Sequence, residues 1–175
     1  MTATELQNLT IIKYPDPRLR QPCEPVVDFD EARALAQRML ELMKAAPGVG
    51  LAAPQVGVPL RMFVMSMPDD TSGDKVFVNP TIHDVSGAKE AEEGCLSLPD
   101  IFVNVRRGLR CRITARTLDN QPIEGNAEEL EARVWQHEID HLDGRLIIDK
   151  MGPGDRIATR KALRELEQQF ADERG

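Results

Sequence analysis

Apolar residues recur every three or four positions in three segments of the chain, and this spacing predicts three helices. The first helix is predicted to begin at Phe29-Asp30, with Asp30 as its N-cap, and to end near Ala46. The last is predicted to run over about 154–172, with densely charged outer faces. Their apolar stripes are Leu35, Met39, Leu42 and Met43 in the first helix, and Leu163, Leu166 and Phe170 in the last.

Alternation of apolar and polar residues predicts strands between the first and second helices. Three short ones are expected at 61–66, 75–79 and 82–85, with a polar turn at 69–74. The clearest alternation lies at 109–117, where Cys111 and its apolar neighbours face one way and a row of arginines faces the other. This segment is predicted to be a half-buried strand with Cys111 in the core.

Three further segments show neither the helical spacing of apolar residues nor the alternation typical of strands. Closely spaced prolines predict an extended, turning arm at 9–27. The small residues of 48–57 predict a loop that backbone or ligand can approach closely, with Gln55 as its one amide side chain. Gly94 and Pro99 predict that 92–99 is irregular, with Cys95 in the loop.

The central helix carries two histidines on its apolar stripe, which is formed by Leu130, Val134, His137 and His141. Asn126 is predicted to cap this helix and Gly144 to end it. His137 and His141 lie about one helical turn apart, so both imidazoles can reach one metal ion. Because unpartnered histidines facing a core are costly, the inward direction of the stripe favours a bound ligand over a solvated face.

Glu138 follows the first histidine and can reach a water bound to such a metal. The pattern His-Glu-x-x-His is typical of metal-assisted hydrolysis. A tetrahedral hydrolytic site needs a third protein ligand. Cys95 is the preferred choice and suits iron(II), cobalt, nickel or zinc, while Asp143 and Asp149 are alternatives. An acidic third ligand would indicate a zinc endopeptidase, and a metal-binding scaffold without activity is a third hypothesis.

The length of 175 residues predicts one domain, 1–175. The net charge of −7 argues against nucleic-acid or membrane-surface binding as the main activity. No apolar run reaches transmembrane length, and no secretory signal is evident at the N-terminus. Three sparse cysteines do not predict a disulfide framework, so a reducing, cytoplasmic location is expected.

Three motifs together make the chain resemble the peptide deformylase family. They are Gly48-Val49-Gly50-Leu51-Ala52-Ala53-Pro54-Gln55, Glu93-Gly94-Cys95-Leu96-Ser97 and Gln136-His137-Glu138-Ile139-Asp140-His141. The opening segment 12–20 also resembles the N-terminal arm of that family. The resemblance covers nearly the whole chain, and the joint match of three motifs is far more specific than any one of them.

The resemblance implies a role for several of these residues. It implies that Cys95, His137 and His141 hold one divalent metal, with Fe(II) as the native ion and Zn, Ni or Co able to replace it. Glu138 would be the general acid and base. Gln55 and the Leu96 backbone N–H would stabilise the oxyanion, and Gly50 would bind the substrate backbone.

The implied reaction is removal of the N-formyl group from the N-terminal formylmethionine of newly made polypeptides, with release of formate, in the bacterial cytoplasm. An apolar pocket for the methionine side chain is expected to be lined by Val49, Leu130, Val134 and the carbon face of His137. Arg133 stands where an apolar residue is common in the family. Its stem is expected to line the pocket while its guanidinium lies in water.

The fold expected from the elements and the resemblance is α+β. Mostly antiparallel strands would pack around the central metal-binding helix, with an additional C-terminal helix. In some bacterial deformylases that last helix docks on the ribosome, and the basic residues Arg156, Arg160, Lys161 and Arg164 fit this idea. Interspersed acidic residues equally fit a solvated packing helix.

Overall fold

The computed structural model describes every residue except 69, 70, 72 and 175. The predicted turn at 69–74 therefore falls partly outside the described residues. In chain order the elements are α1 (Ala3–Gln7), η1 (Pro17–Arg20), α2 (Phe29–Ala45), β1 (Gly50–Ala52), η2 (Ala53–Val56), β2 (Met62–Met65), β3 (Lys75–Ser86), β4 (Lys89–Cys95), β5 (Leu98–Arg107), β6 (Arg110–Arg116), β7 (Pro122–Glu128), α3 (Glu129–Leu142), η3 (Ile147–Asp149) and α4 (Pro153–Asp172), where η marks a 3₁₀ helix.

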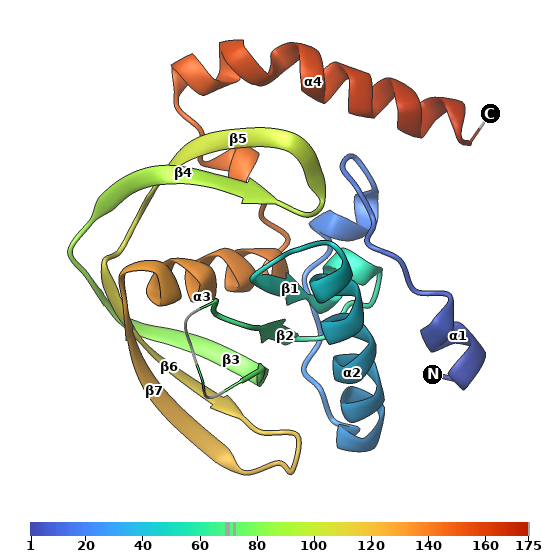
Figure 1. Ribbon diagram of the computed structural model, residues 1–175, viewed down its shortest axis with the longest axis vertical. Coiled ribbons are helices and arrows are strands. Elements are labelled where there is room, and N and C mark those ends of the chain that lie inside the picture. The colour runs from blue at the N-terminus through green and yellow to red at the C-terminus, as the bar shows by residue number, and fades with distance from the viewer. Residues whose placement is uncertain (69–70, 72, 175) are drawn as a thin grey trace.

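The strands form two antiparallel sheets, which confirms the predicted α+β class. Five strands pair in the order β1-β2-β3-β6-β7, and β4 pairs with β5 in a separate hairpin. The helix α3 lies between the large sheet and the hairpin, and α4 covers the other side of the hairpin (Figure 1). The central helix is therefore enclosed by strands on both sides.

The face of α3 toward the large sheet is held by an aromatic cluster. Phe63 of β2 stacks on Phe77 of β3 with 4.8 Å between ring centroids, and Trp135 of α3 meets Phe77 edge-on at 5.5 Å. All three side chains are buried. Burying one such side chain contributes roughly 1.5–3 kcal/mol, so this cluster fixes α3 firmly against the sheet.

The helix α2 packs on β1 and β2 with the predicted stripe. Leu35, Met39 and Met43 are fully buried, whereas Leu42 is only partly buried. The predicted N-cap was wrong by two residues. The cap is Asp28, whose carboxylate accepts from the backbone N–H groups of Asp30 and Glu31, because Phe29 is already the first helical residue.

The strands around 80 and 95 differ from prediction. The segment 82–85 is not a separate strand but the continuation of β3 through a β-bulge between Val78 and Thr81. The segment 92–99 is not irregular, since it contains the end of β4 and the start of β5. Gly94 and Pro99 are accommodated because the pairing shifts register between Glu93 and Cys95.

The two ends of α3 are set by backbone. Asn126 lies in β7 and does not cap the helix. The N-cap is Glu128, which makes no side-chain cap, and the first helical N–H, that of Glu129, donates to the carbonyl of Leu109 at 2.9 Å. A backbone carbonyl of the turn between β5 and β6 therefore does what a capping side chain would do. Gly144 follows the helix with φ +71°, as predicted for a helix-ending glycine.

The N-terminal arm is extended, as predicted, apart from the short η1. It contains a cis peptide bond between Tyr14 and Pro15. The Tyr14 hydroxyl donates to Glu167 of α4 at 2.6 Å, which ties the arm to the last helix. The helix α1 had no sequence prediction. Among the described residues, no helix is both long and apolar enough to cross a membrane.

Candidate metal centre

Three donor atoms converge where α3 meets the β4–β5 hairpin. The thiol of Cys95 and one ring nitrogen from each of His137 and His141 all lie within 4.8 Å of one another. The His141 Nε2 is 3.3 Å from the Cys95 Sγ and 3.2 Å from the His137 Nε2. Cys95 is at the end of β4, and Leu96 and Ser97 turn the chain into β5.

These separations fit a metal ion. Ligand atoms around a tetrahedral ion with metal–nitrogen and metal–sulfur distances of about 2.1 and 2.3 Å lie about 3.4–3.6 Å apart. The Nδ1 of His137 faces a carboxylate oxygen of Glu93 at 3.0 Å, and this contact orients the ring so that its Nε2 points toward His141. Within the described residues, the buried Nδ1 of His141 has no hydrogen-bond partner. The donor set therefore fits a divalent cation.

The alternative third ligands lie elsewhere. The Asp143 carboxylate accepts from Arg61 at 2.8 Å. Asp149 pairs with Arg20 and accepts from the Leu146 N–H at 2.8 Å. Neither belongs to the cluster of donor atoms that the structure brings together. Of the three candidate residues that the sequence left open, Cys95 is the one that the described part of the structure brings to the two histidines.

Glu93 is the centre of a buried ionic network behind His137. Its Oε1 accepts from Arg107 Nε at 2.5 Å and from Arg133 Nη1 at 2.6 Å, and its Oε2 accepts from Arg107 Nη2 at 2.9 Å in addition to His137. Arg107 continues to Asp140 at 2.8 Å. Burial alone would raise the pKa of Glu93, but the hydrogen bonds from His137 and Arg107 outweigh it and hold that pKa well below its usual range.

The histidines differ in their titration. Burial and the positive charge of His137 lower the pKa of His141, which keeps that imidazole neutral and able to bind a metal. Burial also opposes the charge of His137, but its hydrogen bonds with Cys95 and Glu93 raise its pKa to about 10 in the metal-free protein. A cation held by these residues would take the place of that proton on His137.

Glu138 is buried against β1. A Cβ atom at Gly50 would lie 2.4 Å from the Glu138 Oε1, so a larger residue there would displace the carboxylate. Its Oε2 is buried and finds no partner among the described residues. Burial raises the pKa of Glu138 to about 7, a value suited to taking up and giving back a proton near neutral pH.

Gln55 is held rigidly on η2. Its Oε1 accepts from the Ala52 N–H at 2.9 Å. Its Nε2 donates to the Ser97 hydroxyl at 3.2 Å and faces the Cys95 Sγ at 3.5 Å. The amide therefore presents an N–H to the same space as the thiol. The predicted loop 48–57 consists of β1 followed by η2, so this donor stands on ordered backbone.

A cavity of about 680 Å³ opens in front of these groups. Its lining includes Cys95, His137 and Glu138 together with all of the residues predicted to bind substrate, namely Val49, Gly50, Leu130, Arg133 and Val134. Val134 is 5% exposed, but Leu130 is 50% exposed and Val49 36%. Of the predicted stripe, Val134 and His141 are buried and His137 is partly buried. Leu130 is exposed because it lies in the first turn of α3, at the cavity mouth.

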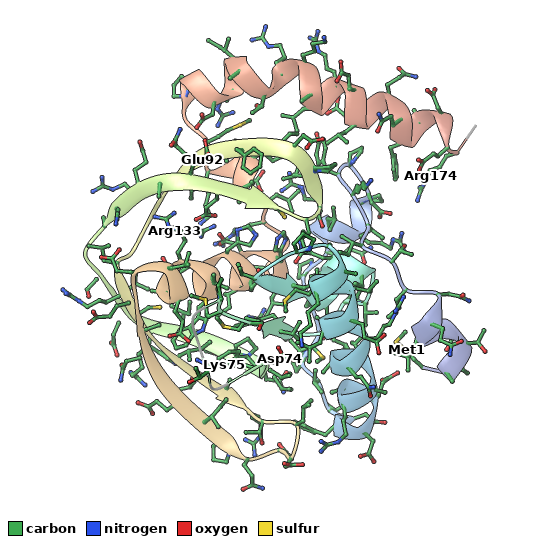
Figure 2. All side chains as sticks on the ribbon, in the orientation of Figure 1. Met1, Asp74, Lys75, Glu92, Arg133 and Arg174 are labelled. Carbon is green, nitrogen blue, oxygen red and sulfur yellow. The ribbon has the colours of Figure 1, made fainter. Side chains whose placement is uncertain are left out.

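The guanidinium of Arg133 is not in water, contrary to prediction. Besides Glu93, it donates to the carbonyls of Val105 at 2.9 Å and Lys89 at 2.8 Å. Figure 2 shows Arg133 between α3 and the hairpin. The guanidinium lies inside the protein because Glu93 and the backbone carbonyls of β4 and β5 accept the hydrogen bonds that water would otherwise accept.

Sequence reasoning assigned no role to Glu93, Arg107, Asp140 or Ser97. Glu93 stood within a recognised motif, but its function depends on side chains distant in sequence. An arginine at an inward position of an alternating strand, such as Arg107 after Val103 and Val105, would have indicated a buried carboxylate partner. That signal was hidden because β5 itself was not predicted.

Fold and site together define a hydrolase of the kind that holds its metal on a His-Glu-x-x-His helix. The family model described as polypeptide deformylase matches residues 8–156. A peptide deformylase of Acidobacterium capsulatum is 44% identical over 161 residues, covering 90% of this chain and 95% of its own.

Solved structures agree. A peptide deformylase of Plasmodium falciparum superposes with a TM-score of 0.89 at 33% identity, covering 93% of this chain and 98% of its own. One from Legionella pneumophila gives a TM-score of 0.85 at 40% identity, covering 93% of this chain and 97% of its own. The chain belongs to the peptide deformylase family. These metal-dependent hydrolases remove the N-formyl group from N-terminal formylmethionine.

Proposed function

We propose that Cys95, His137 and His141 hold the metal and that Glu138, Gln55 and Leu96 carry out deformylation around it. The observation that supports this most is the convergence of the three donor atoms beside the buried Oε2 of Glu138, which has no hydrogen-bond partner among the described residues. A metal bound there would supply Lewis-acid activation of a water and of the formyl oxygen. Fe(II) is our proposal for the native ion, with Zn, Ni or Co as substitutes.

The chain's own groups then account for the proton and charge movements. Glu138 takes a proton from the attacking water, whose oxygen bonds to the formyl carbon. Negative charge develops on the formyl oxygen, toward which the Gln55 Nε2–H and the Leu96 N–H donate. One such donor is typically worth roughly 3–4 kcal/mol in the transition state. Glu138 delivers the proton to the leaving nitrogen as the carbon–nitrogen bond breaks, giving formate and a free amine.

Substrate binding follows from the cavity. The methionine side chain would enter between Val134 and the carbon face of His137, past Val49 and Leu130, with the stem of Arg133 in the wall. Gly50 would hydrogen-bond the peptide backbone. The strand β1 stands first in the order β1-β2-β3-β6-β7 and so lies at an edge of the five-stranded sheet. An edge strand can accept an extended peptide as an added strand.

The test is the substitution Glu138→Gln in metal-loaded protein. We expect bound metal to stay while release of formate from formyl-Met-Ala-Ser falls by orders of magnitude, because the amide cannot accept and return a proton. Turnover equal to that of the unaltered protein would contradict the assignment. Metal analysis of protein purified without oxygen tests the proposal of iron.

We further propose a cytoplasmic protein that acts on nascent chains and contacts the ribosome through α4. Thr159 is the one buried side chain of that helix among its described residues, and the exposed Ile157 lies beside Arg160, Lys161 and Arg164. Co-sedimentation with ribosomes of the full chain and of an Arg160→Glu, Arg164→Glu variant tests this. Equal sedimentation of the two would contradict it.

A further inference from the structure

The N-terminal arm is hydrogen-bonded to both segments that carry the proposed oxyanion donors. The Ile12 N–H donates to the backbone carbonyl of Gln55 at 2.8 Å, and the Tyr14 N–H donates to the carbonyl of Ser97 at 2.9 Å. The Gln55 side chain in turn donates to the Ser97 hydroxyl at 3.2 Å. The arm, η2 and the turn between β4 and β5 therefore form one closed ring of hydrogen bonds.

This ring lies directly behind the two donors. Gln55 supplies the side-chain amide, and Leu96, whose N–H is the second proposed donor, immediately precedes Ser97. Ser97 is fully buried and Gln55 is 1% exposed, so water does not compete for the bonds that join them to the arm. The separation of the two donors is therefore set by the arm as well as by the contact between Gln55 and Ser97.

The arm is itself fixed on either side of the ring. Ile11 packs against the buried cluster under α2, and Ile12 packs against the cluster that contains the inward residues of β5. Farther along the arm, the Cys23 N–H donates at 3.0 Å to the carbonyl of Leu142, the residue after His141. An arm held at these points is a rigid spacer between the segments that build the site.

We propose that Ile12 and Tyr14 are positioning residues for deformylation, whose backbone N–H groups set the separation of the Gln55 and Leu96 donors. The inference rests on the proposed function, in which both donors bind one formyl oxygen. Stabilisation by fixed donors depends on their geometry, and a misplacement of about 1 Å can lower a rate roughly 100-fold. The arm should therefore affect the chemical step more than substrate binding.

The experiment replaces one arm amide at a time by an ester, through incorporation of the matching α-hydroxy acid into the full chain. The replacement removes the N–H and leaves the side chain in place. Lys13 is the matched control, because it lies between Ile12 and Tyr14 and its N–H donates to no other residue in the described part of the structure.

In metal-loaded protein, the esters at Ile12 and Tyr14 should each lower kcat for formyl-Met-Ala-Ser by about 10-fold and change KM by less than about 2-fold. The ester at Lys13 should leave both constants as in the unaltered protein. The two esters are measured separately, so either one decides if the other fails to fold, and circular dichroism checks each fold.

Two further measurements separate positioning from a general loss of structure. In a Gln55→Ala background, the ester at Ile12 should have little further effect on kcat, because the donor that it positions is gone. The NMR signals of the Gln55 side-chain amide, assigned by their absence from Gln55→Ala, require no turnover. They should move in the Ile12 ester and stay in place in the Lys13 ester.

The outcomes also separate this inference from the function beneath it. Unchanged kcat in the Ile12 and Tyr14 esters, an equal loss in the Lys13 ester, an undiminished loss in Gln55→Ala, or unmoved amide signals would each overturn the role of the arm and leave deformylation in place. If the unaltered, metal-loaded protein releases no formate, the proposed function fails, and this inference fails with it.

Discussion

The Nδ1 of His137 donates to Oε2 of Glu93 at 3.0 Å, and Glu93 in turn receives hydrogen bonds from Arg107 and Arg133. A carboxylate behind a ligating histidine fixes its tautomer and ring orientation. Because Glu93 sits two residues before Cys95, the same strand supplies one proposed ligand and orients another.

Glu93→Gln should weaken metal binding by about 10- to 100-fold, since the neutral amide orients His137 less strongly. Competition with a chromogenic chelator measures the affinity, and far-UV circular dichroism checks the fold. Glu92→Gln is the matched control, because that neighbour is exposed and outside the network. Equal losses in the two variants would show that Glu93 has no special role.

Cys95→Ala should bring metal content from one ion per chain toward zero. Asp143 and Asp149, the alternative third ligands, are held away from the site by Arg61 and Arg20. Inductively coupled plasma analysis after desalting gives the stoichiometry, with Cys111→Ala as a control that should keep its ion. If Cys95→Ala keeps its full metal content, the result would favour the alternative hypothesis, in which a carboxylate is the third ligand.

Arg133→Met should lower the free energy of unfolding by about 1–3 kcal/mol, because it removes the hydrogen bonds to Glu93 and to the carbonyls of Val105 and Lys89. Urea denaturation followed by fluorescence of the single tryptophan, Trp135, measures it. Arg106→Met, an exposed arginine of the same hairpin, should change stability by less than about 0.5 kcal/mol. If the two variants have the same free energy of unfolding, the hydrogen bonds of Arg133 contribute nothing to stability.

Thiol labelling at pH 8 should separate Cys95 from Cys23 and Cys111, which are buried. Burial raises the pKa of both Cys23 and Cys111 to about 11, so at pH 8 little thiolate is present and the side chains are also inaccessible. Intact-mass analysis with iodoacetamide should show no label on metal-loaded protein, one after chelation and three in urea. Labelling of Cys111 in the folded protein at pH 8 would contradict this.

Segments with a regular apolar pattern were predicted well because the pattern within each segment shows which of its faces is buried. The stripes of α2 and α4 and the alternation of β6 need no knowledge of the partner element. The prediction that Asn126 caps α3 was wrong because the Glu129 N–H donates to the carbonyl of Leu109, twenty residues earlier along the chain. The hairpin was missed because a register shift absorbs Gly94, which locally indicates a loop.

The site was predicted in the same uneven way. His137, Glu138 and His141 could be predicted from their spacing on one helix. The residue pattern alone left Cys95, Asp143 and Asp149 as alternatives for the third ligand. The distinction depends on the three-dimensional fold, which brings the Cys95 thiol to the histidines. The guanidinium of Arg133 was misplaced because its acceptors, Val105 and Lys89, belong to the unpredicted hairpin.

The β4–β5 hairpin carries both the Cys95 thiol and the orienting Glu93. Inward positions of β5 such as Val103 and Arg107 fasten this ribbon to the core and to the ionic network. A displacement of the hairpin would therefore shift one proposed metal ligand and the carboxylate that orients another at the same time.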